Sequence, residues 1–206
     1  MAKTRRDTAD HYTLRARKEG YPARSVYKLE ELQSKHTLIK PGDTVLDVGA
    51  APGSWTLYTH RQLIKERGLI VAVDLKPLAL NTLPPTVISY TGDAFSPEIK
   101  GKLISHGPYD VVISDAAPQT TGNRSVDTSR SEYIGDQILL LAQEHLKPGG
   151  NLVFKLFQGG AEREFLTKMR SLFTKAKIFK PKASRQDSFE IFLIGLGRVD
   201  SHLGNR

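Results

Sequence analysis

Short runs of apolar, mostly β-branched residues recur along the chain. Five of them are apolar at nearly every position, which is typical of strands that helices cover on both faces of a parallel sheet. These five runs span 44–50, 69–75, 86–92, 109–116 and 151–157. A sixth run follows at 188–196, and a weaker one precedes it at 176–181. The pattern therefore predicts seven strands.

Helical patterns lie between these runs, at 55–67, 129–147 and 162–175. Regular alternation of strands and helices predicts an α/β doubly wound sheet. The loop between the last two runs is shorter than the dozen or so residues of a parallel crossover, so we expect them to form an antiparallel hairpin. A seven-stranded, mostly parallel sheet with such a hairpin is the Rossmann-like fold of S-adenosylmethionine (SAM) methyltransferases, a likeness of fold that leaves function open.

Length and composition exclude several classes of protein. The 206 residues suffice for one domain, in which we expect a basic, mostly helical extension over 1–40 and the sheet domain over 41–206. Cysteine is absent, which excludes disulfides and thiol nucleophiles, and the six histidines lack ligand spacing, so no metal site is expected. No apolar stretch approaches the roughly 20 residues that span a bilayer. We expect a cytoplasmic monomer that binds no membrane.

Positive charge gathers at the two ends of the chain. Residues 1–28 carry eight Lys and Arg against three Asp and Glu, and residues 155–206 carry eleven against five. The middle, 29–154, is mildly acidic, with eleven against fourteen. Clustered positive charge attracts polyanions. Nucleic-acid binding and a merely solvated basic surface are both compatible with this distribution.

A glycine-containing loop joins the first strand to the following helix. In VLDVGAAPGSW, Gly49 and Gly53 permit a tight turn and close approach to a ligand at a helix N-terminus. The spacing is not that of a dinucleotide fingerprint, and Pro52 removes an amide that would hold a pyrophosphate. The loop therefore suits a ligand with a carboxylate and an ammonium group, although a plain strand–helix turn remains an alternative.

Two carboxylates follow the next two strands. Asp74 ends the second strand and could accept both ribose hydroxyls of a nucleoside, while Asp93 follows the third and could accept an adenine amino proton. The alternative for each is a turn or capping carboxylate. Trp55 could pack on the nucleoside or in the core. Because ligands bind at the carboxyl ends of strands in such sheets, three features on successive ends favour a cofactor site.

Four separated charged residues are the strongest candidates for chemistry. Lys28, Asp115, Lys155 and Glu190 lie in YKLEE, ISDAAP, VFKLFQG and SFEIF. Lys155 interrupts a strand that should be buried on both faces, where an unpaired charge is costly. Two ammonium and two carboxylate groups could neutralise one another in one cleft. The alternative is a local pair between Lys28 and a glutamate of its own helix, with Glu190 facing solvent.

Taken together, these motifs resemble the FtsJ/RrmJ (RlmE) family of SAM-dependent RNA ribose 2′-O-methyltransferases, bacterial type. The likeness runs from about residue 23 to 197 and includes ARSVYKLEE, DVGAAPGSW, DAAP, VDTSRS-Y, LKPGG-LVFKLFQG and SR-SFE-F. Ser54 and Gln119 depart from residues frequent in the family. The resemblance implies a catalytic set of Lys28, Asp115, Lys155 and Glu190. It implies cofactor contacts at Gly53, Trp55, Asp74, Asp93 and Asp115.

The resemblance also implies an activity and a substrate. We expect methyl transfer from SAM to the 2′-hydroxyl of a uridine in large-subunit (23S) ribosomal RNA, on the assembled 50S particle; a 2′-hydroxyl excludes DNA. The alternatives are the transfer-RNA anticodon loop and a non-catalytic RNA-binding assembly factor. Lys155 either accepts the hydroxyl proton as a neutral amine or stabilises the developing alkoxide as a cation.

Overall fold

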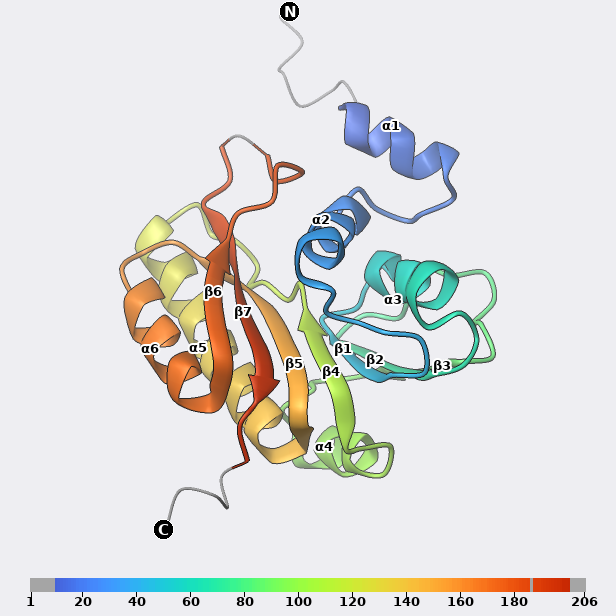
Figure 1. The fold of residues 1–206 in the computed structure, drawn as a ribbon. Coiled ribbons are helices and arrows are strands. Elements are labelled where there is room, and N and C mark those ends of the chain that lie inside the picture. The colour runs from blue at the N-terminus through green and yellow to red at the C-terminus, as the bar shows by residue number, and fades with distance from the viewer. Residues whose placement is uncertain (1–9, 186, 201–206) are drawn as a thin grey trace, which may run out of the picture.

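Seven strands form one mixed sheet in the computed structural model, which describes residues 10–185 and 187–200 (Figure 1). The strand order is β3-β2-β1-β4-β5-β7-β6, and β1 to β5 run parallel. The strands span Thr44–Val48 (β1), Leu69–Asp74 (β2), Val87–Thr91 (β3), Tyr109–Ser114 (β4), Leu146–Phe157 (β5), Phe173–Phe179 (β6) and Glu190–Arg198 (β7). The predicted α/β sheet of seven mostly parallel strands is confirmed.

The predicted C-terminal hairpin is also confirmed, with one feature that the sequence did not indicate. Strand β7 pairs antiparallel with both β6 and β5, so the last strand of the chain lies between them. This insertion sets Glu190, the first residue of β7, opposite Phe157, the last residue of β5. The hairpin therefore delivers a carboxylate to the end of β5.

Both faces of the sheet are covered, as the apolar runs predicted. Successive strand residues alternate between two clusters: Val45 joins one and Leu46 the other. On one face lie α2 (Val26–His36), α3 (Ser54–Tyr58) and a π-helical turn, η1 (Thr59–Ile64). The opposite face is covered by α4 (Pro97–Ile104), α5 (Arg124–His145) and α6 (Glu162–Leu172) (Figure 1). Burial of β1, β2, β4 and the second half of β5 on two sides explains why these runs are continuous rather than alternating, whereas the edge strand β3 is only partly buried.

Several helix boundaries differ from those predicted, for local reasons. The helix over 55–67 divides into α3 and η1. Helix α5 begins five residues early, since the Asn123 side chain caps it by accepting from the amides of the next turn. Helix α6 ends three residues early because Phe173 adopts extended backbone and begins β6. Helix α4, which was not predicted, is short and is capped by Ser96 with Pro97 at its first position.

The described part of the N-terminal segment is helical. Helix α1 spans His11–Lys18 and packs on α2, with Tyr12 against Tyr27 and an ion pair between Arg15 and Glu30. Residues 1–9 of the predicted extension lie outside the described residues. In the described ranges, each helix is too short or too polar to cross a membrane.

Candidate active site

Four charged side chains from four elements meet at the carboxyl end of β5. Lys28 comes from α2, Asp115 follows β4, Lys155 lies in β5 and Glu190 begins β7. The Lys28 Nζ atom lies 2.7 Å from Glu190 Oε1 and 3.7 Å from Asp115 Oδ1. The Lys155 Nζ atom lies 2.9 Å from the same Asp115 oxygen. The four groups, here called the tetrad, thus form a chain of alternating charge.

Burial makes this pairing necessary. Lys155 and Glu190 are each only 8% exposed, and an unpaired charge at such a depth would be strongly destabilising. Lys155 shares a strand face with Val153, whose cluster α2 covers, so Lys28 can reach it from that helix. The Lys155 ammonium also donates to the main-chain carbonyl of Asp115 at 2.6 Å. Its position is therefore fixed by two oxygens of one residue.

The alternative of local pairing on α2 is contradicted. Glu30 pairs with Arg15, and the Glu31 carboxylate accepts from the main-chain amides of Lys182 and Ala183. Both neighbouring glutamates are therefore used elsewhere. Lys28 is left to pair with groups of the tetrad, and Glu190 is buried rather than exposed to solvent.

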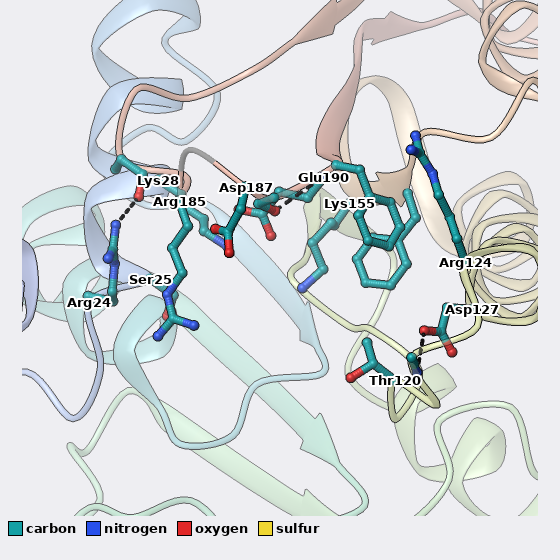
Figure 2. A pocket seen from close by; sticks show the side chains of 15 residues that line it. Arg24, Ser25, Lys28, Thr120, Arg124, Asp127, Lys155, Arg185, Asp187 and Glu190 are labelled. Carbon is teal, nitrogen blue, oxygen red and sulfur yellow. Dashed lines mark hydrogen bonds and ion pairs between the residues drawn. The ribbon is translucent and has the colours of Figure 1, made fainter. Parts of the chain in front are cut away.

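Three members of the tetrad line a cavity of about 590 Å³ (Figure 2). Lys28, Lys155 and Glu190 lie in its wall. Three arginines also line it, and we call it the basic cavity: Arg24, Arg124 and Arg185. The guanidinium of Arg24 donates to the carbonyl of Ala183, which ties the start of α2 to the β6–β7 loop. The cavity thus combines buried paired charge with cationic groups suited to an anionic ligand.

A second cavity of about 510 Å³ lies at the carboxyl ends of β1, β2 and β4. Its carboxylates are Asp74, Asp93 and Asp115, and we call it the acidic cavity. Apolar side chains complete it, among them Leu75, Phe95, Tyr133 and Ile134. Asp115 lines this cavity while the other three members of the tetrad line the basic one. The tetrad therefore stands at the boundary between two cavities.

The carboxylates of the acidic cavity are held by main-chain amides. Asp74 accepts from the amide of Ala51 at 3.0 Å and from that of Lys76 at 2.8 Å, and Asp93 accepts from that of Phe95 at 2.9 Å. Both residues thus make the turn contacts that were their alternative role, and both also line the cavity. A carboxylate oxygen has two lone pairs, so each keeps acceptor capacity for a ligand.

The glycine loop reaches the acidic cavity through Gly49 and Ala51. Gly53 and Trp55 are not among the lining residues. The Trp55 side chain is 2% exposed, donates to the carbonyl of Ser25 at 2.8 Å and packs against Phe192. Trp55 therefore packs in the core, which is one of the two roles considered for it.

The apolar lining of the acidic cavity at Leu75, Phe95 and Ile134 was not predicted, because these residues belong to no motif. Tyr133, by contrast, is the last residue of the VDTSRS-Y segment.

Asp127 orders the loop between the two cavities. Its carboxylate accepts from the amide and hydroxyl of Thr121 at 2.7 and 2.9 Å and from the amide of Gly122 at 3.3 Å. The main-chain hydrogen bond from Thr121, with the others, holds the pKa of Asp127 below its ordinary value. The loop lines the acidic cavity at Gln119 and the basic cavity at Thr120.

Asp47 of β1 is a buried acid that interacts with the carboxylates of Asp115 and Asp74. Its side chain is 1% exposed, and Oδ2 accepts from the Thr56 hydroxyl at 2.7 Å. Burial raises the pKa of Asp47 to about 7, and the carboxylates of Asp115 and Asp74 add to the rise. In the unfolded chain an aspartate titrates near pKa ~3.9. The folded protein therefore binds more protons than the unfolded chain between these two values.

We predict that the free energy of unfolding falls as pH rises from about 4 to 7, with a contribution from Asp47 on the order of 4 kcal/mol at most. Asp47→Asn keeps an acceptor for Thr56 and cannot ionise. As the pH rises from 5 to 8, the wild type should therefore lose stability that the variant keeps. The difference between their free energies of unfolding, measured by urea unfolding, should grow in favour of the variant. An equal loss of stability in both proteins over that range would contradict a buried, neutral acid at this position.

Comparisons with known proteins agree on one family. A family model described as FtsJ-like methyltransferase matches residues 21–198. A protein of Treponema denticola named ribosomal RNA large subunit methyltransferase E is 50% identical over 196 residues, covering 95% of this chain and 98% of its own. A protein of the same name from Desulforapulum autotrophicum is 47% identical over 191 residues, covering 92% and 93%.

Solved structures show the same fold. A ribosomal RNA methyltransferase from Plasmodium falciparum has a TM-score of 0.76 at 23% identity, covering 87% of this chain and 99% of its own. Human methyltransferase-like protein 13, in complex with SAH, has a TM-score of 0.59 at 15% identity, covering 95% and 87%. At these identities the likeness concerns the fold alone.

Proposed function

The chain belongs to the FtsJ-like methyltransferase family, and we propose that it transfers a methyl group from SAM to the ribose 2′-hydroxyl of a uridine in large-subunit ribosomal RNA. The family makes the chain a methyltransferase with SAM as its methyl donor. The acceptor atom, the nucleoside and the RNA are our proposal. The observation that carries it is the position of the tetrad at the boundary between an acidic and a basic cavity.

The acidic cavity suits SAM. The cofactor carries an ammonium and a sulfonium, and Asp74, Asp93 and Asp115 supply negative charge at three points of the wall. In the assignment we propose, Asp74 accepts from the ribose hydroxyls and Asp93 from the adenine amino group. Apolar residues such as Phe95 and Ile134 would contact the adenine faces. Gly53 and Trp55, which the family resemblance also assigns to the cofactor, would act by shaping the loop and its core support.

SAM supplies an electrophilic methyl group on a good leaving group, so the chain has to position the acceptor and handle its proton. Positioning of two reactants can contribute several kcal/mol of barrier lowering. In our proposal the Lys155 amine contacts the 2′-hydroxyl from the wall of the basic cavity. Asp115 fixes that amine through two oxygens, and Lys28 joins Asp115 to Glu190. These three are positioning residues for Lys155.

The basic cavity suits RNA. Arg24, Arg124 and Arg185 can contact phosphates, which orients a nucleic acid without reading its sequence. The basic residues of α1 and of 163–185 extend this charge beyond the cavity. Selection of one nucleotide would then come from the shape of a preassembled particle. The relatives named large subunit methyltransferase E favour the large subunit over transfer RNA for this role.

The test is transfer of tritium from methyl-labelled SAM to three acceptors. They are large ribosomal subunits from a strain that lacks the enzyme, naked ribosomal RNA and transfer RNA. We expect label on large subunits above that on naked RNA, and nucleoside analysis should recover 2′-O-methyluridine. Preferential label on transfer RNA would favour the anticodon-loop alternative, and a labelled base would contradict ribose methylation. SAM binding without transfer to any acceptor would favour a non-catalytic assembly factor.

A further inference from the structure

Two aromatic rings lie in the wall of the basic cavity, outside the three apolar clusters of the described residues. Phe157 ends β5 and Phe189 directly precedes β7, and their ring centroids lie 4.7 Å apart at 58°. Both line the basic cavity. Neither belongs to any of the three apolar clusters that the described residues form. Phe157 is 8% exposed, whereas Phe189 is only partly buried. The less buried ring thus presents apolar surface to the cavity.

The position of Phe189 is fixed from several sides. Its carbonyl accepts from the amide of Gln158 at 2.8 Å, which anchors the residue to the end of β5. The guanidinium carbon of Arg124 lies 5.2 Å from the Phe189 centroid, within the range of a cation–π contact. Phe189 is also joined by a peptide bond to Glu190 of the tetrad. A ligand on this ring would therefore lie beside the tetrad.

The depth of Lys155 restricts how RNA can reach it. The side chain is 9% exposed and lines the basic cavity. A ribose within a stacked helix keeps its neighbours on both sides, and enzymes that act on buried positions of a nucleic acid take the target nucleotide out of the stack. The volume of about 590 Å³ is in the range of small-molecule sites. One extruded nucleotide therefore suits this cavity better than a continuous helix.

We propose that Phe189, supported by Phe157 and Arg124, is the stacking platform for the base of the acceptor nucleotide, which enters the basic cavity extruded from its strand. This inference rests on the proposed function and adds a binding residue to it. Stacking on an aromatic ring tolerates any base, so the platform sets depth and orientation rather than sequence. The substrate class that follows is an unpaired or easily unpaired nucleotide with phosphates on either side.

The kinetic test compares four proteins in methyl transfer to isolated large subunits: wild type, Phe189→Ala, Phe189→Trp and Phe179→Ala. Loss of one base-stacking ring corresponds to roughly tenfold in binding. We expect Phe189→Ala to lower kcat/KM about tenfold, with the dissociation constant of SAM unchanged, and Phe189→Trp to retain most activity. Phe179 is a partly buried ring of the same hairpin outside the cavity, so Phe179→Ala should match the wild type.

A binding test separates this inference from the proposed function, because it requires no chemistry. Fluorescence anisotropy would compare a labelled single-stranded oligouridylate with an RNA duplex of equal length. We expect the wild type to prefer the single strand and Phe189→Ala to lose that preference while binding the duplex as before. Unchanged kcat/KM and strand preference in Phe189→Ala, or equal defects in the alanine and tryptophan variants, would overturn the stacking role. Wild-type preference for the single strand without methyl transfer would instead count against the proposed function alone.

Discussion

Replacing Lys155 with alanine is expected to lower the rate of methyl transfer by at least about a thousandfold, with little change in SAM affinity. The amine is the only tetrad cation within 3 Å of Asp115, and it lines the cavity proposed for the acceptor. In the proposed mechanism it contacts the hydroxyl that reacts. The acidic cavity, by contrast, does not include Lys155, so the cofactor should still bind.

A control must show that the loss of activity comes from removing an amine at the site and not from removing any lysine of β5. Lys147 offers a matched control, since it lies near the other end of the same strand and pairs with Asp110 at 2.8 Å, outside both cavities. Lys147→Ala should therefore keep nearly full transfer. Single-turnover transfer and calorimetric titration with SAM would be run on both variants. Substantial transfer by Lys155→Ala would remove this residue from the mechanism.

Arginine at position 155 could perform only one of the two roles considered for Lys155. A guanidinium stays charged and can stabilise an alkoxide, but it cannot accept a proton. Partial activity in Lys155→Arg would therefore favour charge stabilisation, with the proton leaving to another group. An inactive Lys155→Arg with normal SAM binding would favour an amine that accepts the proton. The geometry at Asp115 is compatible with both roles.

The sequence predicted those parts of the fold that depend on a single continuous segment of the chain. Burial of a strand on two faces requires apolar side chains at successive positions, so β1, β2, β4 and β5 could be located from their composition. The short loop before β7 likewise excluded a parallel crossover. Position across the sheet is decided by pairing between distant segments, and for that reason the insertion of β7 between β5 and β6 could not be predicted.

Site residues could be predicted where a charged residue interrupts an otherwise apolar segment. Lys155 was identifiable because a charge inside a buried strand demands partners. The partners of Lys28 depend on the contact between α2 and the start of β7, which no local spacing encodes. Phe189 passed unnoticed because an apolar residue at the start of a strand usually packs in a core. In the structure it is distinguished by its partial exposure, its place in the wall of the basic cavity and its absence from the apolar clusters of the described residues.

Replacing Gly49 with alanine is expected to destabilise the fold and to weaken SAM binding together. The backbone of Gly49 has φ of 76°, a conformation that costs other L-residues roughly 1–2 kcal/mol. A Cβ atom there would lie 2.6 Å from the Cα and Cβ atoms of Ala116. The Cα atom of Ala116 belongs to the main chain of the loop after β4, so the clash can be relieved only by moving that loop or β1. Overpacking of this kind adds about 1–3 kcal/mol.

The same movement would disturb the acidic cavity, since Gly49, Asp115 and Ala116 all line it. We therefore expect SAM affinity to fall by more than about tenfold, which corresponds to a loss of 1.4 kcal/mol or more in binding. Urea unfolding would give the stability of the variant, and calorimetric titration with SAM would give its affinity. The two losses should appear together, because one displaced loop causes both.

Gly42→Ala separates the conformational cost from the contact with Ala116. Gly42 has φ of 94°, and a Cβ atom there would meet nothing within 4 Å. It also lies outside the acidic cavity, so its replacement should cost about 1–2 kcal/mol of stability and leave SAM affinity unchanged. If Gly49→Ala matched Gly42→Ala in both measurements, the close approach between the β1 and β4 loops would not shape the cofactor site. If Gly49→Ala lost more stability and more SAM affinity than Gly42→Ala, the contact between Gly49 and Ala116 would set the distance of Asp115 from the cofactor.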